Sequence, residues 1–159
     1  MIQITISGYK TLTLSHLVMD YNGTLACDGW LIDGVADLLH RLSKELSVHV
    51  LTADTFGRAR AELEGLPLSL CILPEEKQDK GKLNHIQQLG ADTVVAIGNG
   101  RNDKLMLAHA GLGIALLQEE GACAETLASA HMVCRTILDA LNLLTNPKRL
   151  IAGLRRRRM

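Results

Sequence analysis

The sequence has few aromatic residues, no excess of either charge and no long hydrophobic run. Phe, Trp and Tyr make up 3% of the 159 residues, too few for the aromatic platforms on which nucleic-acid bases stack. Lys and Arg number 17 and so do Asp and Glu, so the formal net charge is zero and we expect no nucleic-acid partner. No apolar run approaches the ~20 residues that span a bilayer, so we expect no membrane partner.

The cysteines are scattered, and the first residues lack a targeting pattern. They are Cys27, Cys71, Cys123 and Cys134. Because they include no C-x-x-C pair, we expect reduced thiols rather than a disulfide framework. Residues 1–7 alternate polar and apolar side chains and lack the basic and apolar segments of a signal peptide. We therefore expect a cytoplasmic protein.

Strands and helices are predicted to alternate along the chain. Residues 1–14 alternate in polarity around Gly8, which predicts a β-hairpin. Strands are expected at 16–20, 48–52, 68–73, 94–97, 113–116 and 131–134, and helices at 35–42, 58–64, 82–89, 103–109, 120–129 and 136–144. Asp33 is the expected cap of the first helix. This alternation is typical of a three-layer, Rossmann-like α/β fold with a parallel sheet.

We interpret residues 1–159 as a single domain with three parts. An N-terminal hairpin (1–15) precedes the core (16–146). A further helix begins at Pro147 and leads into a basic tail that contains four consecutive arginines, so the third part is 147–159. A charge run of this kind is usually a solvated end of the chain, although it could also contact an anionic partner.

Several predicted strands end on polar residues that suit one chemistry. Asp20 ends the first strand of the core, Thr52 ends the second, and Asp103 follows the glycines after the fourth. Parallel strands present such residues at one edge of the sheet. There a carboxylate can attack phosphorus, a hydroxyl and the ammonium of Lys82 can bind phosphate oxygens, and a second acid can complete a Mg²⁺ site.

These motifs resemble those of the haloacid dehalogenase superfamily. The run from Asp20 to Leu25 reads D-Y-N-G-T-L and resembles its D-x-D/T-G-T-L first motif, while Thr52 and Lys82 match the second and third. Residues 98–103 read G-N-G-R-N-D and resemble the fourth motif, G-D-G-x-N-D. The resemblance covers about residues 16–134. It is closest to the phosphorylation domain of P-type ATPases, with its D-K-T-G-T motif, and to stand-alone soluble relatives of that domain.

The resemblance implies a phosphatase or phosphotransferase, which could be ATPase-like, that forms an aspartyl-phosphate on Asp20. It implies Mg²⁺ held by Asp20, Asp103 and the backbone carbonyl of Asn22, with the side chain of Asn99 as a further oxygen donor. Expected phosphate contacts are Gly23, Thr24, Thr52, Ala53, Lys82 and Asn102. The substrate is expected to be a phosphorylated small molecule or a phosphoprotein.

Two positions depart from the family pattern. Asn22 stands where family phosphatases carry a general acid/base, and an amide does not shuttle protons. Asn99 replaces the first acid of the fourth motif. We therefore expect slow turnover, and the alternative is a catalytically weak phosphate- or nucleotide-binding module that regulates a partner. Lys80 and Lys77 are alternatives to Lys82 as the lysine of the site.

The segments between the motifs are too short to hold a cap domain. Each is accounted for by a loop, a helix and a strand, so we expect an open site or one covered by another subunit of a homo-oligomer. Trp30 either flanks the site mouth or packs in the core. A receiver domain needs acids before its aspartate, and residues 1–19 have none. A G-x-G-x-x-G dinucleotide site is excluded because Asp103 stands at the third glycine.

Overall fold

The structure is a computed structural model that describes residues 1–54 and 57–156. Its centre is a six-stranded parallel sheet in the order β10-β9-β8-β3-β6-β7. The strands are β3 (His16–Asp20), β6 (Ser47–Thr52), β7 (Ser69–Ile72), β8 (Val94–Gly98), β9 (Leu112–Leu116) and β10 (Met132–Cys134). The predicted Rossmann-like α/β sheet is confirmed. The last three residues of the predicted basic tail lie outside the described residues.

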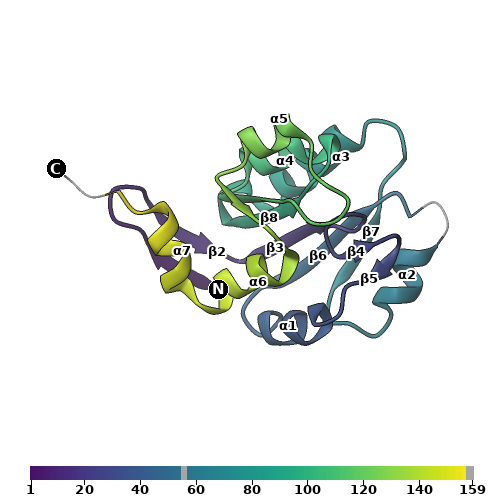
Figure 1. The fold of residues 1–159 in the computed structure, drawn as a ribbon, viewed down its shortest axis with the longest axis horizontal. Helices are drawn as coiled ribbons and strands as arrows, with labels where there is room; N and C mark the ends of the chain where they lie inside the picture. The colour runs from purple at the N-terminus through teal and green to yellow at the C-terminus, as the bar shows by residue number, and fades with distance from the viewer. Residues whose placement is uncertain (55–56, 157–159) are drawn as a thin grey trace.

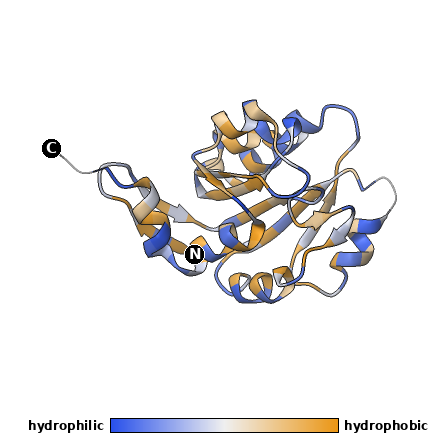
Figure 2. Ribbon diagram, viewed as in Figure 1, coloured by the Kyte–Doolittle hydropathy of each residue, from blue (hydrophilic) through white to orange (hydrophobic). Residues whose placement is uncertain are grey.

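Helices cover both faces of this sheet (Figure 1). They are α1 (Val35–Leu42), α2 (Arg58–Leu63), α3 (Gln78–Leu89), α4 (Lys104–His109), α5 (Ala124–Ser129) and α6 (Ile137–Thr145). One apolar core lies beneath α1, α2 and α6, and a second lies beneath α3 and α4. Because β8 and β9 are covered on both faces, they consist of hydrophobic residues and glycine. In Figure 2 the helices α1 and α2 carry both blue and orange residues, as expected for helices with one face on the core.

The register of the central strands brings the predicted motif residues to one edge. Asp20 pairs with Leu51 of β6, one residue before Thr52, and Met19 pairs with Ile97 of β8. The carboxyl ends of β3, β6 and β8 therefore lie side by side. Loops that leave these three strands start from the same edge of the sheet.

A second unit extends from the sheet at the other end of the molecule (Figure 1). The predicted hairpin forms from β1 (Ile2–Thr5) and β2 (Thr11–Leu14), which pair antiparallel. The C-terminal helix α7 (Pro147–Leu154) packs against β1. The backbone N–H of Arg156 then donates to the carbonyl of Ser7 at 2.9 Å, which ties the chain after α7 to the hairpin turn.

Four local predictions are wrong. Helix α3 begins at Gln78, four residues early, because its polar first turn carries no apolar periodicity. Helix α5 begins only at Ala124, since the loop before it is held extended by the Cys123 N–H, which donates to the Asn99 carbonyl at 2.9 Å. The N-cap of α1 is Gly34 rather than Asp33, in a left-handed conformation that favours glycine.

The fourth is the segment between β3 and α1. The sequence predicts a loop in this segment, but the segment contains a short antiparallel hairpin of β4 (Ala26–Cys27) and β5 (Trp30–Leu31). Strands of two residues are too short to show an alternating pattern. Within the described residues, no larger insertion separates the motif-bearing strands, and no helix is long and apolar enough to cross a membrane.

Candidate active site

Lys82 joins two carboxylates at the carboxyl edge of the sheet. Its Nζ donates to Oδ1 of Asp20 at 2.9 Å and to Oδ1 of Asp103 at 2.8 Å. A third bond runs to Oδ1 of Asn102 at 3.1 Å. Lys82 is fully buried, whereas the alternatives Lys77 and Lys80 are exposed. Of these three lysines, Lys82 is therefore the one that the structure places between the acids.

The direction of the Lys82 side chain follows from the docking of α3. Lys82 and Ile86, one turn later, are the buried residues of this helix, so they share the face that meets the sheet. The helix begins early enough to place Lys82 in its second turn. A buried ammonium is stable only when paired and hydrogen-bonded, and the three acceptors meet that requirement.

Asp103 is held by the backbone of the loop after β8. Its Oδ2 accepts from the N–H groups of Asn99 and Gly100, both at 3.0 Å. The carboxylate also lies against Gly98, where a Cβ atom would be 2.5 Å from Asp103 Cγ. A side chain at position 98 would thus displace the carboxylate. The first glycine of the fourth motif is explained by this close approach.

The electrostatic balance of the site is negative. Burial raises the pKa of Asp20 to about 7, and the nearby Asp103 adds to this effect, while Lys82 partly opposes it. Burial lowers the pKa of Lys82, but the two carboxylates outweigh it and hold that pKa above its usual value. With one ammonium between two carboxyl groups, the ionised cluster has a net negative charge that a further cation would neutralise.

An open cleft of about 580 Å³ lies in front of this cluster. Of the predicted site residues it is lined by Asp20, Asn22, Thr52, Ala53, Asn99 and Asn102. Lys82 and Asp103 lie fully buried, in contact with Asp20 or with one another. Thr52 Oγ1 accepts from the Asp54 N–H at 3.2 Å, which leaves its own O–H proton free to donate. The structure thus brings eight predicted residues into one site.

Gly23 and Thr24 take no part in the lining of this cleft. Both are buried, and the side chain of Gln118 donates to the two carbonyls at 2.9 Å. Gly23 lies against Asn99, where a Cβ atom would be 2.3 Å from Asn99 Nδ2. Asn99 itself donates to the Gly121 carbonyl at 3.0 Å and accepts from the Thr24 hydroxyl at 3.4 Å. These contacts hold the first and fourth motif loops together.

The mouth of the cleft contains residues that the motifs did not indicate. Arg58 lines the cleft, and its guanidinium lies 4.2 Å from the centre of the Trp30 ring. Trp30 is 61% exposed, so the alternative that it packs in the core is wrong. The hairpin that carries Trp30 is fixed by the Tyr21 hydroxyl, which donates to the Gly29 carbonyl at 2.9 Å. No sequence signal distinguished Arg58 from other surface arginines.

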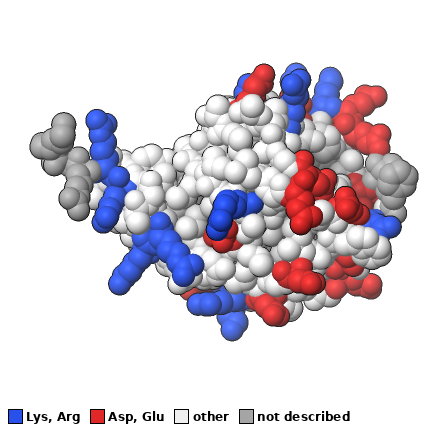
Figure 3. Space-filling model, viewed as in Figure 1, with Lys and Arg blue, Asp and Glu red and all other residues white. Residues whose placement is uncertain are grey.

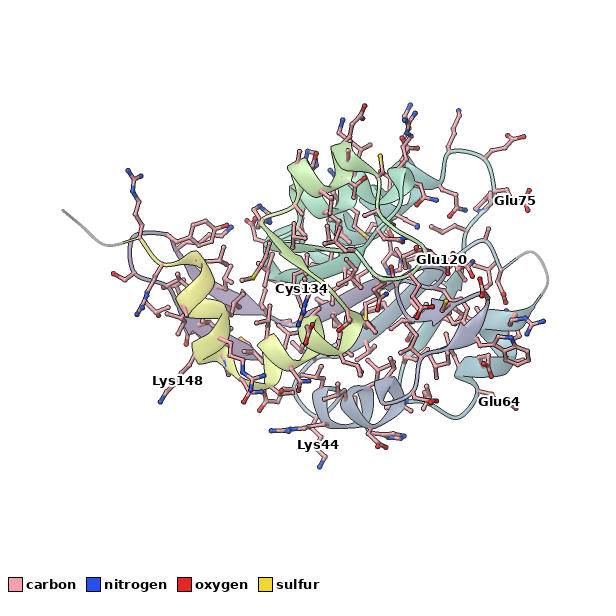
Figure 4. The ribbon with its side chains drawn as sticks, in the orientation of Figure 1. Lys44, Glu64, Glu75, Glu120, Cys134 and Lys148 are labelled. Atoms are coloured by element: carbon pink, nitrogen blue, oxygen red, sulfur yellow. The ribbon has the colours of Figure 1, made fainter. Side chains whose placement is uncertain are left out.

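Acidic side chains surround this mouth. Asp28, Asp54 and Glu75 line the cleft, and Figure 4 labels Glu75 on the loop that leads to α3. Asp54 is already engaged, because its carboxylate accepts from the N–H groups of Ala59 and Arg60 at the start of α2, at 2.8 and 3.1 Å. It fixes the helix that carries Arg58.

Residues 80–137 match the family described as haloacid dehalogenase-like hydrolase. The matched segment is about a third of the chain and contains Lys82, Asn99 and Asp103. An uncharacterised protein of Methanocaldococcus jannaschii is 49% identical to it over 59 residues, which are 37% of this chain and 63% of that protein. The match therefore spans less than two thirds of that relative.

Solved structures share the haloacid dehalogenase fold over most of the chain. One of them is the 3-deoxy-D-manno-octulosonate 8-phosphate phosphatase from Moraxella catarrhalis, in complex with magnesium ion, phosphate ion and KDO. It is 18% identical to this chain with a TM-score of 0.65, and the match covers 88% of this chain and 92% of that one. The cobalt-bound phosphatase of the same name from Haemophilus influenzae is 15% identical with a TM-score of 0.70, covering 86% and 90%. At these identities the likeness establishes the fold.

Proposed function

We propose that this protein is a magnesium-dependent phosphohydrolase or phosphotransferase that carries the phosphoryl group on Asp20. The observation that supports it is the Lys82 ammonium bonded to both Asp20 and Asp103, at 2.9 and 2.8 Å, beside an open cleft. A nucleophilic carboxylate next to fixed positive charge is what phosphoryl transfer needs. We propose a phosphorylated small molecule as the substrate, in keeping with the sugar phosphate named for the similar phosphatases; a phosphoprotein is the alternative.

The oxygen donors of the site fit a hard divalent cation. Asp20 and Asp103 both accept a hydrogen bond from the same nitrogen atom, Lys82 Nζ. The family resemblance implies the backbone carbonyl of Asn22 as a further metal ligand, and Asn22 lines the same cleft. The described residues hold no group of three or more His, Cys, Asp or Glu that could bind a metal, so two carboxylates and uncharged oxygens would form the site. Bound there, Mg²⁺ would neutralise charge on the transferring phosphoryl group.

The proposed reaction has two steps on the phosphorus atom. A carboxylate oxygen of Asp20 bonds to phosphorus, the bond to the leaving group breaks, and the leaving oxygen takes a proton from solvent. Water or an acceptor hydroxyl then attacks phosphorus, gives its proton to solvent, and the bond to Asp20 breaks. Lys82 stays protonated and neutralises charge throughout, and the free O–H of Thr52 donates to a phosphate oxygen.

The side chain at position 22 sets the expected rate. Asn22 is exposed at the cleft, where an acid would protonate the leaving group and later deprotonate water. An amide does neither. We therefore propose that good leaving groups such as aryl phosphates react faster than alkyl phosphates, and that the aspartyl-phosphate is long-lived.

Substitution at position 22 tests this mechanism. Asn22→Asp is expected to raise turnover of an alkyl phosphate by roughly 100-fold, which is the lower range for an added general acid, and that of p-nitrophenyl phosphate by less. Asp20→Asn, alone or with Asn22→Asp, is expected to abolish turnover. Equal turnover of the alkyl phosphate by the wild type and Asn22→Asp would disprove the assigned role of position 22.

A regulatory phosphate- or nucleotide-binding module is the second candidate. Asn22 favours it, and so does Asn99, because hydrogen bonds to Gly121 and Thr24 already engage its side chain. Incubation with acetyl phosphate and Mg²⁺ separates the two functions. The enzyme consumes acetyl phosphate through Asp20, whereas the module binds phosphate in a calorimeter without turnover in either the wild type or Asp20→Asn.

A further inference from the structure

The charges of this protein are separated between its two ends. Residues 1–15 and 147–156 contain five Lys and Arg residues and no Asp or Glu. Residues 16–146 contain ten Lys and Arg residues and all 17 of the Asp and Glu residues. Arg157 and Arg158 complete the 17 basic residues of the sequence, so its zero net charge is the sum of a basic end and an acidic core.

The fold brings the two basic segments together. The N–H of Arg156 donates to the Ser7 carbonyl at 2.9 Å, and its backbone lies so close to Gly8 that a Cβ there would be 2.3 Å from the Arg156 oxygen. Leu150 of α7 is buried in the same apolar cluster as Ile2. Residues more than 140 positions apart in the sequence thus form one structural unit.

We call the five cations of this unit the basic cluster. Its members are Lys10, Lys148, Arg149, Arg155 and Arg156, all exposed. On the face drawn in Figure 3, the hairpin end shows blue side chains and no red ones, and Figure 4 shows Lys148 pointing away from the molecule. A set of like charges held on a rigid unit raises the local positive potential.

The basic cluster makes no ion pair with any acidic residue that the structure describes. In the part of the chain that the structure describes, the cations in ion pairs are Lys82, Lys104 and Arg135, none of which belongs to the cluster. Lys10 Nζ lies 5.3 Å from the centre of the Tyr9 ring, which is 40% exposed. The cluster is therefore free to neutralise charge on another molecule.

We propose that this hairpin–α7 unit binds the phosphate backbone of nucleic acid without reading its sequence. A membrane is disfavoured because the apolar side of α7 is already packed, with Leu150 buried and Ile151 and Leu154 against the core, so this helix has no apolar face with which to enter a bilayer. Two strand residues of the same unit, Gln3 and Thr11, also expose hydrogen-bonding groups of the kind that contact phosphates and sugars.

This surface lies away from the cleft. The hairpin and α7 stand at one end of the molecule, and α2 with the β4–β5 hairpin stands at the other (Figure 1). Binding there leaves the cleft open. The proposal is therefore independent of the phosphatase activity, and it replaces the expectation, drawn from net charge alone, that nucleic acid is not a partner.

Fluorescence anisotropy with a labelled 20-base-pair DNA duplex tests this surface. We expect dissociation constants of roughly 1–100 μM near physiological salt, with the logarithm of affinity falling against the logarithm of salt concentration at a slope of about −4.5 for five phosphate contacts. The double variant Lys148→Gln/Arg149→Gln is expected to bind at least about tenfold more weakly at ~0.1 M salt and to lower the slope by about 1.8.

The matched control is Lys77→Gln/Lys80→Gln, which removes two exposed cations at the start of α3. It should bind the duplex within twofold of the wild type, and thermal unfolding should show that both double variants are folded. No binding of the duplex at 20 mM salt, or equal weakening by the control, overturns the proposal. Tighter binding to phosphatidylserine vesicles or to polyglutamate than to the duplex overturns the assignment to nucleic acid.

Discussion

At the carboxyl edge of the sheet a cation is buried and fully hydrogen-bonded, whereas the described cations of the hairpin end are exposed and make no ion pair with another described residue. Lys82 is 0% exposed and donates to three side chains. Lys148 and Arg149 are exposed and make no ion pair with any described residue. The same kind of charge thus has two different environments within one chain.

The difference teaches what each charge does for the protein. A buried charge must be compensated, so the carboxyl groups of Asp20 and Asp103 depend on the Lys82 ammonium for stability. An exposed charge is hydrated and adds little to folding. Its contribution is to the electric field that other molecules meet.

The largest expected effect on stability comes from removing Lys82. Lys82→Met leaves two buried carboxyl groups without their ammonium and should lower the free energy of unfolding by about 3–5 kcal/mol at pH 8. The loss should be smaller at pH 5, because Asp20, with a pKa raised to about 7, is then protonated. Urea unfolding measures both values. Lys80→Met, on the exposed side of the same helix, should change the free energy of unfolding by less than about 0.5 kcal/mol. Equal losses of stability in the two variants would contradict the contrast between buried and exposed cations.

A smaller effect of opposite sign is expected from Asp20→Asn. The pKa of Asp20 rises from 3.8 to about 7 on folding because of burial and Asp103, so the folded protein binds more protons between these values. Its free energy of unfolding therefore falls as pH rises from 4 to 7. Asn removes this loss and should stabilise the metal-free protein by on the order of 2 kcal/mol at pH 8. Urea unfolding with a chelator measures it, and a destabilised variant would refute the electrostatic account.

The next effect concerns His49, a half-buried side chain with two other histidines beside it. Burial, with His85 and His16 beside it, lowers the pKa of His49 from 6.5 to about 4, and its Nε2 lies 3.2 Å from His16 Nδ1. The folded state then binds fewer protons, so the His49 contribution to stability is lost as pH falls from 6.5 to 4.

His49→Gln isolates this contribution from that of Asp20, which runs in the other direction. The wild type should lose about 1 kcal/mol more than His49→Gln between pH 7 and pH 5. Urea titrations at the two pH values give the difference. Identical pH dependence in both proteins would show that His49 does not titrate in this way.

The smallest effect on stability is expected from the basic cluster. Lys148→Gln/Arg149→Gln should change the free energy of unfolding by less than about 0.5 kcal/mol, since exposed unpaired charges contribute little. A slight gain is the expected sign, because like charges repel one another. A loss above 1 kcal/mol would mean that these side chains stabilise α7, and the contrast with Lys82 would then fail.

Much of the fold was predictable from local pattern. The hydrophobic runs ending at Asp20 and Thr52 are strands in the structure, and they lie side by side because parallel strands with buried faces share one polar edge. The glycines and Asp103 after the fourth core strand likewise follow it directly. These strands and the loop after them depend on residues that are neighbours in the sequence, so they could be predicted from the sequence alone.

Other features depended on packing between distant segments. Nothing local distinguished Lys82 from Lys80, since the choice depends on which face of α3 meets the sheet. The sequence left open whether Trp30 is buried in the core or exposed at the surface. Its exposure follows from the short hairpin that the Tyr21 hydroxyl fixes. The side chain of Asn99 points to Gly121 and Thr24 because two loops meet there.

The sequence by itself determined the alternation of strands and helices and the order of the acidic, hydroxyl and glycine residues, because these follow from periodicity along the chain. Only the tertiary structure decided which lysine compensates the buried acids, and that the chain after α7 returns to the hairpin turn. Both are contacts between segments far apart in the sequence. The net charge of zero was correct as a sum, and the basic residues after position 146 are visible in the sequence. Folding is what places the hairpin turn, with Lys10, next to them.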